Sequence, residues 1–493
     1  MVTRTLVTTA EEQTWPISKD VPVLFLGEWC KRYNRKKKWE KLNSKVAIFH
    51  WDDRKKLYED YQYIDTLYES LLAELSQKLN QIHSTEYSLR YWRIIVGPWL
   101  GFFIQMLFDR WSMLSESIEK KECKNCIILE RDPIMAIPNS MEHFLKLCIA
   151  DFWNEAIYGE LLEKYFSKLI KIEKITPLNK NKNENNNQQI GWMDELKQKL
   201  KKFVFRVSEI FPNECDYFFI SSYLPLKFDL LLQVRLRQFP RMWRAKKIPL
   251  LKPDMKKRQW QLDCNEINIS SFEVVVRNLI PLHIPTCYLE GYDPLVKILD
   301  LMPWPKNPKL IFTSNSFISD DIFKAWAAKK VEKNIPLVIG QHGGNFGMNP
   351  FSFQEEHQIK IATKWLSWGW SDSNKKQVVP FGNLLAINHA VKYDSKGAIL
   401  MVEMNLPRYS YDLNSMPIAG QFNYYFEDQK SFIDHLPKKI RQKLTLRLYH
   451  NDYEKGVENF WRLNYPDIYI DSGNAKISSL IKKNKIYIST YNA

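Results

Sequence analysis

Residues 310–344 read LIFTSNSFISDDIFKAWAAKKVEKNIPLVIGQHGG, two short apolar runs separated by a helical segment. The runs at 310–314 and 335–340 have the length and the Ile, Leu, Val and Phe content of buried strands. Between them, Asp320 stands at the N-cap position of a helix that we expect to end near Lys333. A strand, a helix and a second strand in this order predict parallel strands joined by a crossover helix.

The same alternation continues toward the C-terminus. Further apolar runs of strand length occur at 365–369, 398–402, 445–449, 468–470 and 485–488. This repetition indicates a doubly wound parallel sheet, in which ligands bind beyond the carboxyl ends of the strands. The pattern begins after residues 301–308, where three prolines punctuate a polar stretch. We therefore expect one domain at 1–302 and a second at 303–493.

The N-terminal part of the chain predicts an α/β domain with additional helices. Strand-like runs occur at 4–10, 21–27 and 46–50. Apolar residues recur at helical spacing between Leu57 and His83. Ser88 then stands at the N-cap of another long helix, which Gly97-Pro98 should kink or restart. Residues 178–190 are dominated by Asn, Lys and Gln, and this composition predicts a disordered loop.

Composition and charge narrow the class of protein. The chain has 493 residues, and its 71 Lys and Arg against 56 Asp and Glu give a net charge of +15. Such charge suits a solvated surface, an anionic membrane surface or phosphorylated substrates, and the scattered basic residues argue against nucleic acid. Seven scattered cysteines suit a reducing compartment. The apolar run 94–108 is too short to span a membrane and predicts a buried helix, so we expect a cytoplasmic protein.

The loop Gln341-His342-Gly343-Gly344 directly follows a predicted strand. Glycines let the backbone approach a phosphate closely, and a histidine can donate a hydrogen bond to charge that develops on a leaving phosphate. No Lys-Ser or Lys-Thr follows, so the loop is not a Walker motif. The alternative interpretation is a tight turn with a structural histidine.

Three carboxylates are candidates for acid–base chemistry. Glu356 lies close to the glycine loop in sequence, where it could act as a general base or bind a ribose hydroxyl, or be part of a solvated helix face. Glu28 and Asp52 each follow a predicted strand beside an aromatic residue, an arrangement typical of a sugar-binding platform. Their alternative interpretation is as helix caps and surface charges.

Two arginines at predicted strand ends, Arg408 and Arg447, are candidates for binding phosphate. The guanidinium group binds phosphate and carboxylate in a bidentate manner, which fits a clamp on an anionic ligand. Either arginine could equally form an ion pair at a domain interface.

Five motifs occur in a characteristic order over nearly the whole chain. They are Leu6-Val7-Thr8-Thr9-Ala10, Phe49-His50-Trp51-Asp52-Asp53-Arg54, Arg90-Tyr91-Trp92-Arg93 with Gly97-Pro98-Trp99-Leu100, Gln341-His342-Gly343-Gly344 and Trp368-Gly369-Trp370. In this order they resemble a family of transferases from O-antigen and other bacterial surface-carbohydrate loci. The C-terminal half is similar to sugar-nucleotide enzymes with two facing Rossmann-like domains, including capsule Kdo transferases and UDP-GlcNAc 2-epimerases.

This resemblance implies a GT-B-like fold, with two Rossmann-like domains facing a cleft. The 1–302 domain would bind the acceptor and the 303–493 domain the nucleotide-sugar. The Gln-His-Gly loop is also similar to that of teichoic-acid glycerophosphotransferases, and the likeness implies contact between His342 and the donor phosphate.

The implied function is a cytoplasmic glycosyltransferase that moves a sugar from a CMP- or UDP-linked donor to an O-antigen or capsule glycan, with peripheral contact to the inner membrane. No cofactor or metal is expected, because the chain has no clear Asp-x-Asp motif. The alternatives are a sugar-nucleotide epimerase or hydrolase on the same scaffold, and a catalytically degenerate scaffold subunit of polysaccharide assembly.

The C-terminus departs from the family pattern. The chain stops soon after the predicted strand at 485–488, where a doubly wound sheet should continue into its next helix. We therefore expect an incomplete C-terminal domain, in which Ser489 and Thr490 begin a phosphate or ribose contact.

Overall fold

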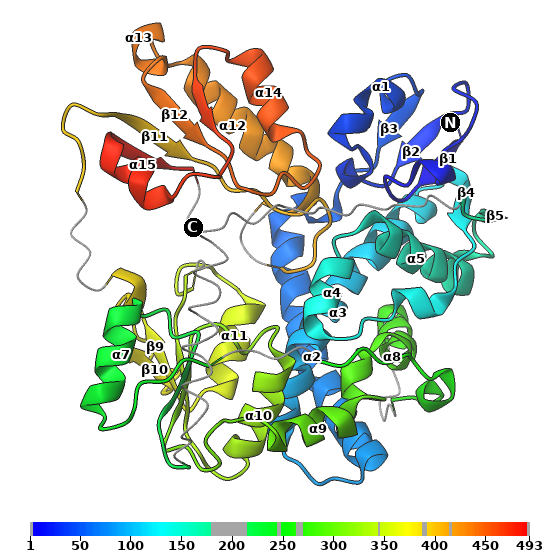
Figure 1. Ribbon diagram of the computed structural model, residues 1–493. Coiled ribbons are helices and arrows are strands. Elements are labelled where there is room, and N and C mark those ends of the chain that lie inside the picture. Colours follow the sequence, from blue (N-terminus) through cyan, green and yellow to red (C-terminus); the bar gives the residue numbers. More distant parts are fainter. Residues whose placement is uncertain are drawn as a thin grey trace.

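The strands of the described residues form three separate parallel sheets. Figure 1 shows the sheets at three corners of the molecule, around the long helices α2 and α3. The protein is therefore an α/β protein with several Rossmann-like sheets, where the sequence pattern predicted two. The computed structural model describes residues 3–178, 214–243, 248–262, 270–343, 346–386, 392–413 and 417–490.

The first sheet, sheet 1, has the strand order β3-β2-β1-β4-β5. Its strands are β1 (Arg4–Val7), β2 (Val23–Phe25), β3 (Ser44–Val46), β4 (Cys123–Leu129) and β5 (Lys171–Ile175). Leu6 of β1 lies opposite Leu24 of β2, and both are fully buried, as expected of inner parallel strands covered on both faces. The order runs outward from β1 on both sides, so the winding direction reverses between β1 and β4.

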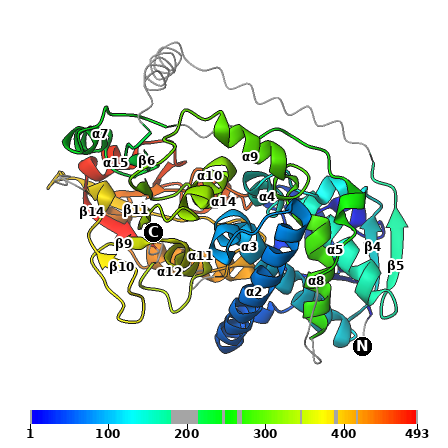
Figure 2. The ribbon, with the colours of Figure 1, turned by 90° about the horizontal axis from the view of Figure 1, so that it is seen from below.

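Helices α2 (Arg54–His83) and α3 (Leu89–Glu119) connect β3 to β4 and form the central support of the molecule. The Asp53 carboxylate caps α2, and the Ser88 hydroxyl caps α3 as the sequence predicts. Seen from below in Figure 2, the two helices run between α5 and α8 on one side and α10 and α11 on the other.

Helix α3 is buried along most of its length. It is the one helix in the described ranges that is long and apolar enough to cross a membrane, and its most apolar stretch lies entirely inside the protein. Contrary to what the sequence led us to expect, the helix does not restart at Gly97-Pro98, because it continues through Pro98 to Glu119. Proline removes one backbone hydrogen bond, and packing against neighbours on every side holds the remaining turns together.

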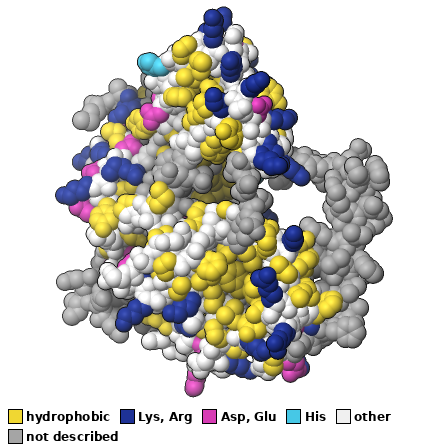
Figure 3. All heavy atoms as spheres, turned by 90° about the vertical axis from the view of Figure 1, so that its left-hand side faces the viewer, with side chains coloured by type: hydrophobic (Ala, Val, Ile, Leu, Met, Phe, Trp, Pro, Cys, Tyr) yellow, Lys and Arg dark blue, Asp and Glu magenta, His cyan; other side chains and the backbone are white. Residues whose placement is uncertain are grey.

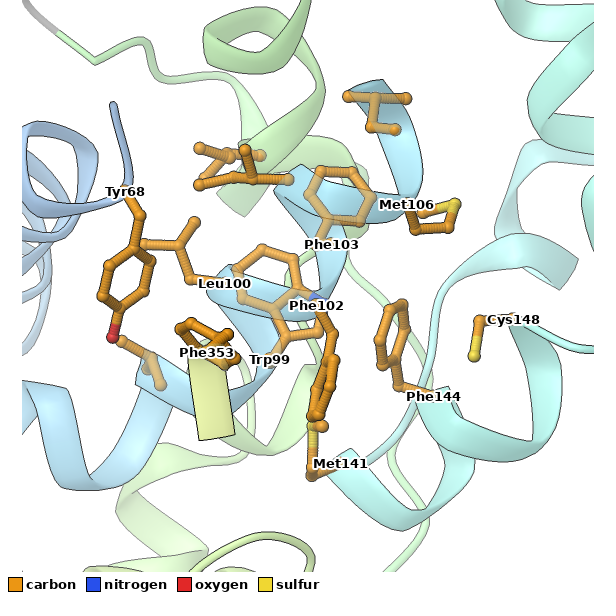
Figure 4. Packing of buried hydrophobic residues seen from close by; sticks show 14 of the residues in the cluster. Tyr68, Trp99, Leu100, Phe102, Phe103, Met106, Met141, Phe144, Cys148 and Phe353 are labelled. Carbon is orange, nitrogen blue, oxygen red and sulfur yellow. The ribbon is translucent and has the colours of Figure 1, made fainter. Parts of the chain in front are cut away.

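A close approach explains a glycine on α3. A Cβ atom at Gly101 would lie 1.9 Å from the ring of Phe353, so only glycine fits. Figure 4 shows this ring against the aromatic cluster of α3 that includes Trp99 and Phe102. The contact packs helix α11 (Phe353–Ile361) of the second sheet against the central support.

The second sheet, sheet 2, has the order β10-β9-β8-β7-β6, so its strands follow one another in sequence. Its strands are β6 (Phe218–Ile220), β7 (Ile311–Thr313), β8 (Leu337–Gly340), β9 (Lys364–Ser367) and β10 (Val378–Pro380). Helix α10 (Asp321–Val331), capped by Asp320 as predicted, packs on α3. The expected domain boundary at 302/303 falls between β6 and β7, which are neighbours in this sheet.

The third sheet, sheet 3, has the order β13-β12-β11-β14 and a hydrophobic core of its own. Its strands are β11 (Ala398–Val402), β12 (Leu444–Arg447), β13 (Tyr469–Asp471) and β14 (Asn484–Ser489). Its helices are α12 (Phe422–Asp434), α13 (Lys438–Arg441), α14 (Val457–Asn464) and α15 (Ile477–Lys483). The winding reverses between β11 and β14, as it does between β1 and β4 of sheet 1.

The remaining α-helices of the described ranges pack around sheets 1 and 2. They are α1 (Lys36–Trp39), α4 (Met141–Leu147), α5 (Asp151–Leu161), α7 (Leu226–Arg235), α8 (Ser271–His283) and α9 (Tyr292–Asp300).

One strand prediction needs correction, and two strands were missed. The expected strand at 46–50 is the shorter β3, which ends at Val46, and His50 lies in a 3₁₀ turn. Strands β5 and β10 were not predicted. Both are edge strands; the Lys-Ile-Glu-Lys-Ile of β5 is largely charged, and the Val-Val-Pro of β10 is only three residues long. Most of the predicted disordered loop, from residue 179 onward, lies outside the described residues.

Candidate functional site

Two of the three sheets contain the topological feature at which parallel sheets bind ligands. A crevice opens where the strand order reverses, because the crossovers on either side go to opposite faces. Sheets 1 and 3 contain such a reversal, whereas the strands described for sheet 2 run in sequence. In sheet 3 the residues beyond the reversal are Glu403, after β11, and Thr490, after β14.

The carboxyl-end loops of sheets 1 and 3 meet each other around two cavities. We call the first, of about 390 Å³, the Lys455 cavity; Glu28 from sheet 1 and Arg408, Phe422 and Lys455 from sheet 3 line it. We call the second, of about 620 Å³, the Asp52 cavity; Asp52 and Arg54 from sheet 1 and Gln421, Tyr425 and Thr490 from sheet 3 line it. The 3₁₀ turn Ala419–Gln421 and the first turn of α12 contribute to both cavities. The structure therefore brings Glu28 together with Arg408, and Asp52 together with Thr490.

Lys455 is a buried cation in the first cavity. Its Nζ donates hydrogen bonds to Asn405 Oδ1 at 3.1 Å and to the Leu406 carbonyl at 2.6 Å, and lies 3.4 Å from the centre of the Phe422 ring. It forms no ion pair with any carboxylate of the described residues. Burial, together with the nearby Arg408 charge, lowers the pKa of Lys455 well below its usual range. An anion in the cavity would supply the missing negative charge.

Arg408 holds the two sheets together. Its guanidinium is buried and bonds the Asp151 carboxylate at 2.7 Å and Glu454 at 2.9 Å, and it also donates to the carbonyl of Trp29. These contacts form the interface ion pair that the sequence left open as an alternative to a phosphate clamp. Arg447, by contrast, lies at the end of β12, where it donates to the carbonyls of Gly473 at 3.4 Å and Ala475 at 3.2 Å.

Glu28 and Asp52 face the cavities from sheet 1. Glu28 begins a 3₁₀ turn after β2 and bonds Lys31 at 3.2 Å, and its side chain lies against Gly420 before α12. Asp52 ends the 3₁₀ turn after β3 and accepts a hydrogen bond from Gln421 Nε2 at 3.3 Å. Both carboxylates are partly accessible to solvent, which a group that exchanges protons with a substrate requires.

A buried polar network fixes the loop from sheet 3 onto α3. Asp109 accepts hydrogen bonds from His50 at 3.0 Å, from Arg110 at 2.7 Å and from the Ser410 hydroxyl at 2.7 Å. Arg110 also donates to Asn154 and to the Ser410 carbonyl. Burial opposes ionisation of Asp109, yet the hydrogen bond from His50 and the Arg110 charge keep its pKa below the usual value. The network gives His50 of the Phe49–Arg54 motif a structural role.

The sequence pattern did not point to Glu403 and Tyr425, which lie at the reversal in sheet 3. Glu403 accepts a hydrogen bond from Trp461 Nε1 at 3.1 Å, and burial raises its pKa to about 8. The Tyr425 hydroxyl bonds Thr490 Oγ1 at 2.6 Å and accepts from the Met404 backbone N–H at 3.1 Å. Glu403 directly follows an apolar run, and that position was the available signal. Ser489 is the last residue of β14.

The loop after β8 follows a strand of sheet 2, and its residues line neither of the two cavities. The Gln341 side chain accepts hydrogen bonds from the Trp368 backbone N–H at 2.9 Å and from Trp370 Nε1 at 3.0 Å, so it holds the Trp368-Gly369-Trp370 turn. Gly343 has a φ of +132°, which favours glycine, and Gly344 lies outside the described residues.

His342 is enclosed by the rings of Tyr223, Phe317 and Phe346. Burial lowers its pKa to about 4, so the imidazole is neutral at physiological pH. Its Nδ1 is buried and makes no hydrogen bond within the described ranges. Glu356, on α11, forms an ion pair with Lys375. Neither His342 nor Glu356 lines the cavities that contain Glu28 and Asp52.

The described residues contain no group of three or more His, Cys, Asp or Glu side chains that could hold a metal ion. The polar groups at the interface are instead lysine, arginine, carboxylate and hydroxyl side chains and the first turn of a helix. Such groups bind anionic and hydroxylated ligands directly.

The fold and these cavities define an α/β protein in which cavities lie between the carboxyl-end loops of two Rossmann-like sheets. Residues 4–493 match the model of the LIC12162 family transferases, and the chain belongs to this family. It is thus an enzyme of the transferase type. A search of curated proteins found no match.

Proposed function

We propose that this transferase is a glycosyltransferase that moves a sugar from a CMP- or UDP-linked donor to an O-antigen or capsule glycan. In this proposal sheets 1 and 3 face each other in a GT-B-like arrangement, and the enzyme acts in the cytoplasm, at the inner face of the membrane. The observation that supports it best is the buried Lys455, a cation without a carboxylate partner among the described residues, in a cavity between two sets of carboxyl-end loops.

The donor phosphates would bind in the Lys455 cavity. The first turn of α12 lines this cavity through Phe422 and Asn423, and the N-terminus of a helix carries partial positive charge. Helix α12 is also the crossover helix after β11, the position at which doubly wound sheets bind phosphate. Lys455 would supply full positive charge as the bond between the sugar and the phosphate oxygen breaks.

The acceptor would approach from sheet 1. Glu28 lines the same cavity as Lys455 and is the group that we assign as the general base for the acceptor hydroxyl. Asp52 and Arg54 line the adjoining surface of the Asp52 cavity, where carboxylate and guanidinium groups can bind sugar hydroxyls.

The loop after β8 is a second candidate for the donor phosphates. The buried Nδ1 of His342 lacks a described hydrogen-bond partner, and this observation keeps the histidine available to a ligand. The epimerase or hydrolase alternative uses the same donor pocket and differs by consuming donor without an acceptor.

Calorimetry with CMP and UDP tests the proposal. We expect the wild type to bind one of them, Lys455→Met to bind it roughly 10- to 100-fold more weakly, because a charged hydrogen bond is lost, and His342→Ala to bind it normally. Lys438→Met, at an exposed lysine of α13, is the matched control. Loss of binding in His342→Ala alone would move the donor site to the β8 loop. Failure of the wild type to bind either nucleotide would favour the scaffold alternative.

A further inference from the structure

Helix α7 covers the outer face of sheet 2 with only one of its sides. Leu232 and Leu236 pack on a small core formed by Phe219 and Phe312 of the sheet. The opposite side of the helix lies at the surface of the protein.

This outer side of α7 and the turn after it carry large apolar side chains. Leu226 is 56% exposed, Leu231 41%, Val234 54% and Phe239 61%. Figure 3 looks onto the side of the molecule that carries α7, and it shows hydrophobic side chains gathered on the lower part of this face, with Lys and Arg among them and Asp and Glu toward the margin. Contiguous apolar surface of this kind marks a site of interaction.

The same surface is positively charged. Lys227, Arg235 and Arg237 are exposed, and none forms an ion pair with a residue that the structure describes. The one acidic residue of α7, Asp229, is half-buried and accepts hydrogen bonds from Ser222 and from Gln233. Apolar side chains therefore share this outer surface of α7 and the following turn with cations that have no ion-pair partner in the described part of the chain.

We infer that this α7 face, formed by Leu226, Lys227, Leu231, Val234, Arg235, Arg237 and Phe239, docks the protein on an anionic membrane surface. Apolar side chains of an interfacial helix enter the headgroup region, while Lys and Arg bind the anionic lipids. A second copy of the chain is a poorer partner, because a two-fold contact would place the same cations against each other. The overall charge of +15 favours the same partner. This inference does not depend on the proposed sugar transfer.

Co-sedimentation of the full chain with lipid vesicles tests the inference. We expect the wild type to bind phosphatidylglycerol-containing vesicles at low salt and to stay in solution with phosphatidylcholine alone. The variant Lys227→Gln/Arg235→Gln/Arg237→Gln should partition about 100-fold less, since each cation near an anionic surface contributes roughly fivefold. The variant Leu231→Glu/Val234→Glu should lose at least about tenfold.

The matched control is Leu301→Glu/Leu463→Glu. Leu301 is 77% exposed and directly follows α9, and Leu463 is 75% exposed and lies on α14. The control should bind vesicles like the wild type, and all variants should keep the wild-type melting temperature. Equal loss in the control and in the α7 variants, or no binding by the wild type, would overturn the inference. So would a wild-type dimer without vesicles that Leu231→Glu/Val234→Glu converts to a monomer, because the face would then join copies of the chain.

Discussion

The interface of sheets 1 and 3 and the loop after β8 both place polar residues beyond the carboxyl ends of parallel strands, yet the two regions differ in what those residues do. At the interface, Lys455 and Glu28 line an open cavity. In the β8 loop, the Gln341 side chain accepts hydrogen bonds from two tryptophans, and His342 is packed among aromatic rings. The strand order reverses at sheets 1 and 3 and runs in sequence in the described part of sheet 2. Strand order therefore separates these two regions of the molecule, whereas the presence of polar residues after a strand does not.

The largest effect should come from the proposed general base. Glu28→Gln removes the proton acceptor and keeps the shape of the side chain, so we expect kcat to fall roughly 10²- to 10⁴-fold with little change in nucleotide binding. Steady-state sugar transfer and calorimetry on the same sample measure both quantities. Asp52→Asn serves as the comparison from the neighbouring cavity, and a larger loss of kcat there would assign the base to Asp52.

The next effect concerns the buried charges that join sheet 3 to α3. Arg110→Ala leaves Asp109 buried with fewer partners, and we expect the free energy of unfolding to fall by about 3–5 kcal/mol. Urea denaturation measures the change. Arg462→Ala removes an exposed ion pair with Glu458 and should cost less than about 1 kcal/mol. Similar losses in the two variants would show that the interface does not depend on its buried network.

A smaller effect separates structure from ligand binding in the β8 loop. Gln341→Ala leaves the Trp368 and Trp370 N–H groups without their acceptor, so we expect a loss of roughly 1–3 kcal/mol in stability. Nucleotide affinity should stay unchanged, as measured by calorimetry below the melting temperature. A well-folded Gln341→Ala protein that no longer binds nucleotide would make the β8 loop the donor site.

The sequence predicted the strand–helix alternation from 310 onward and the caps at Ser88 and Asp320 correctly, because these features depend on local patterns. It did not predict three sheets, since the partner of a strand depends on contacts distant in sequence. Strand β6 ends at Ile220 and β7 begins at Ile311, so these neighbouring strands are separated by 90 residues of intervening chain. Short apolar runs contain no information on that choice.

The candidate site was predicted only in part, because the sequence shows which residues follow a strand but not which of them meet in the folded protein. Glu28, Asp52, Arg408 and Thr490 were recognised as polar residues at strand ends, and the structure brings them into two adjoining cavities. Lys455 and Tyr425 were missed because each depends on tertiary burial, which turns an ordinary surface residue type into a cavity lining. The sequence also did not reveal that His342 lies on a different sheet from the candidate clamps Arg408 and Arg447, and that each of the three side chains has separate partners.

The smallest effect is a difference in pH dependence between the two regions. His342 has its pKa lowered to about 4 by burial, so the unfolded chain binds the proton more readily between pH 4 and 6.5, and this group makes stability rise with pH in that window. Glu403 has its pKa raised from 4.5 to about 8, so the folded protein binds the proton more readily and stability falls as pH rises through that window.

The two contributions therefore oppose each other, each with a slope of at most about 1.4 kcal/mol per pH unit. Urea denaturation at several pH values should show that Glu403→Gln makes stability rise more steeply with pH than in the wild type, and that His342→Gln makes it rise less steeply. Unchanged slopes in Glu403→Gln would mean that the carboxyl group is hydrated in solution. The reversal point of sheet 3 would then be open to water, and Glu403 would join Glu28 and Asp52 as a carboxylate accessible to the acceptor.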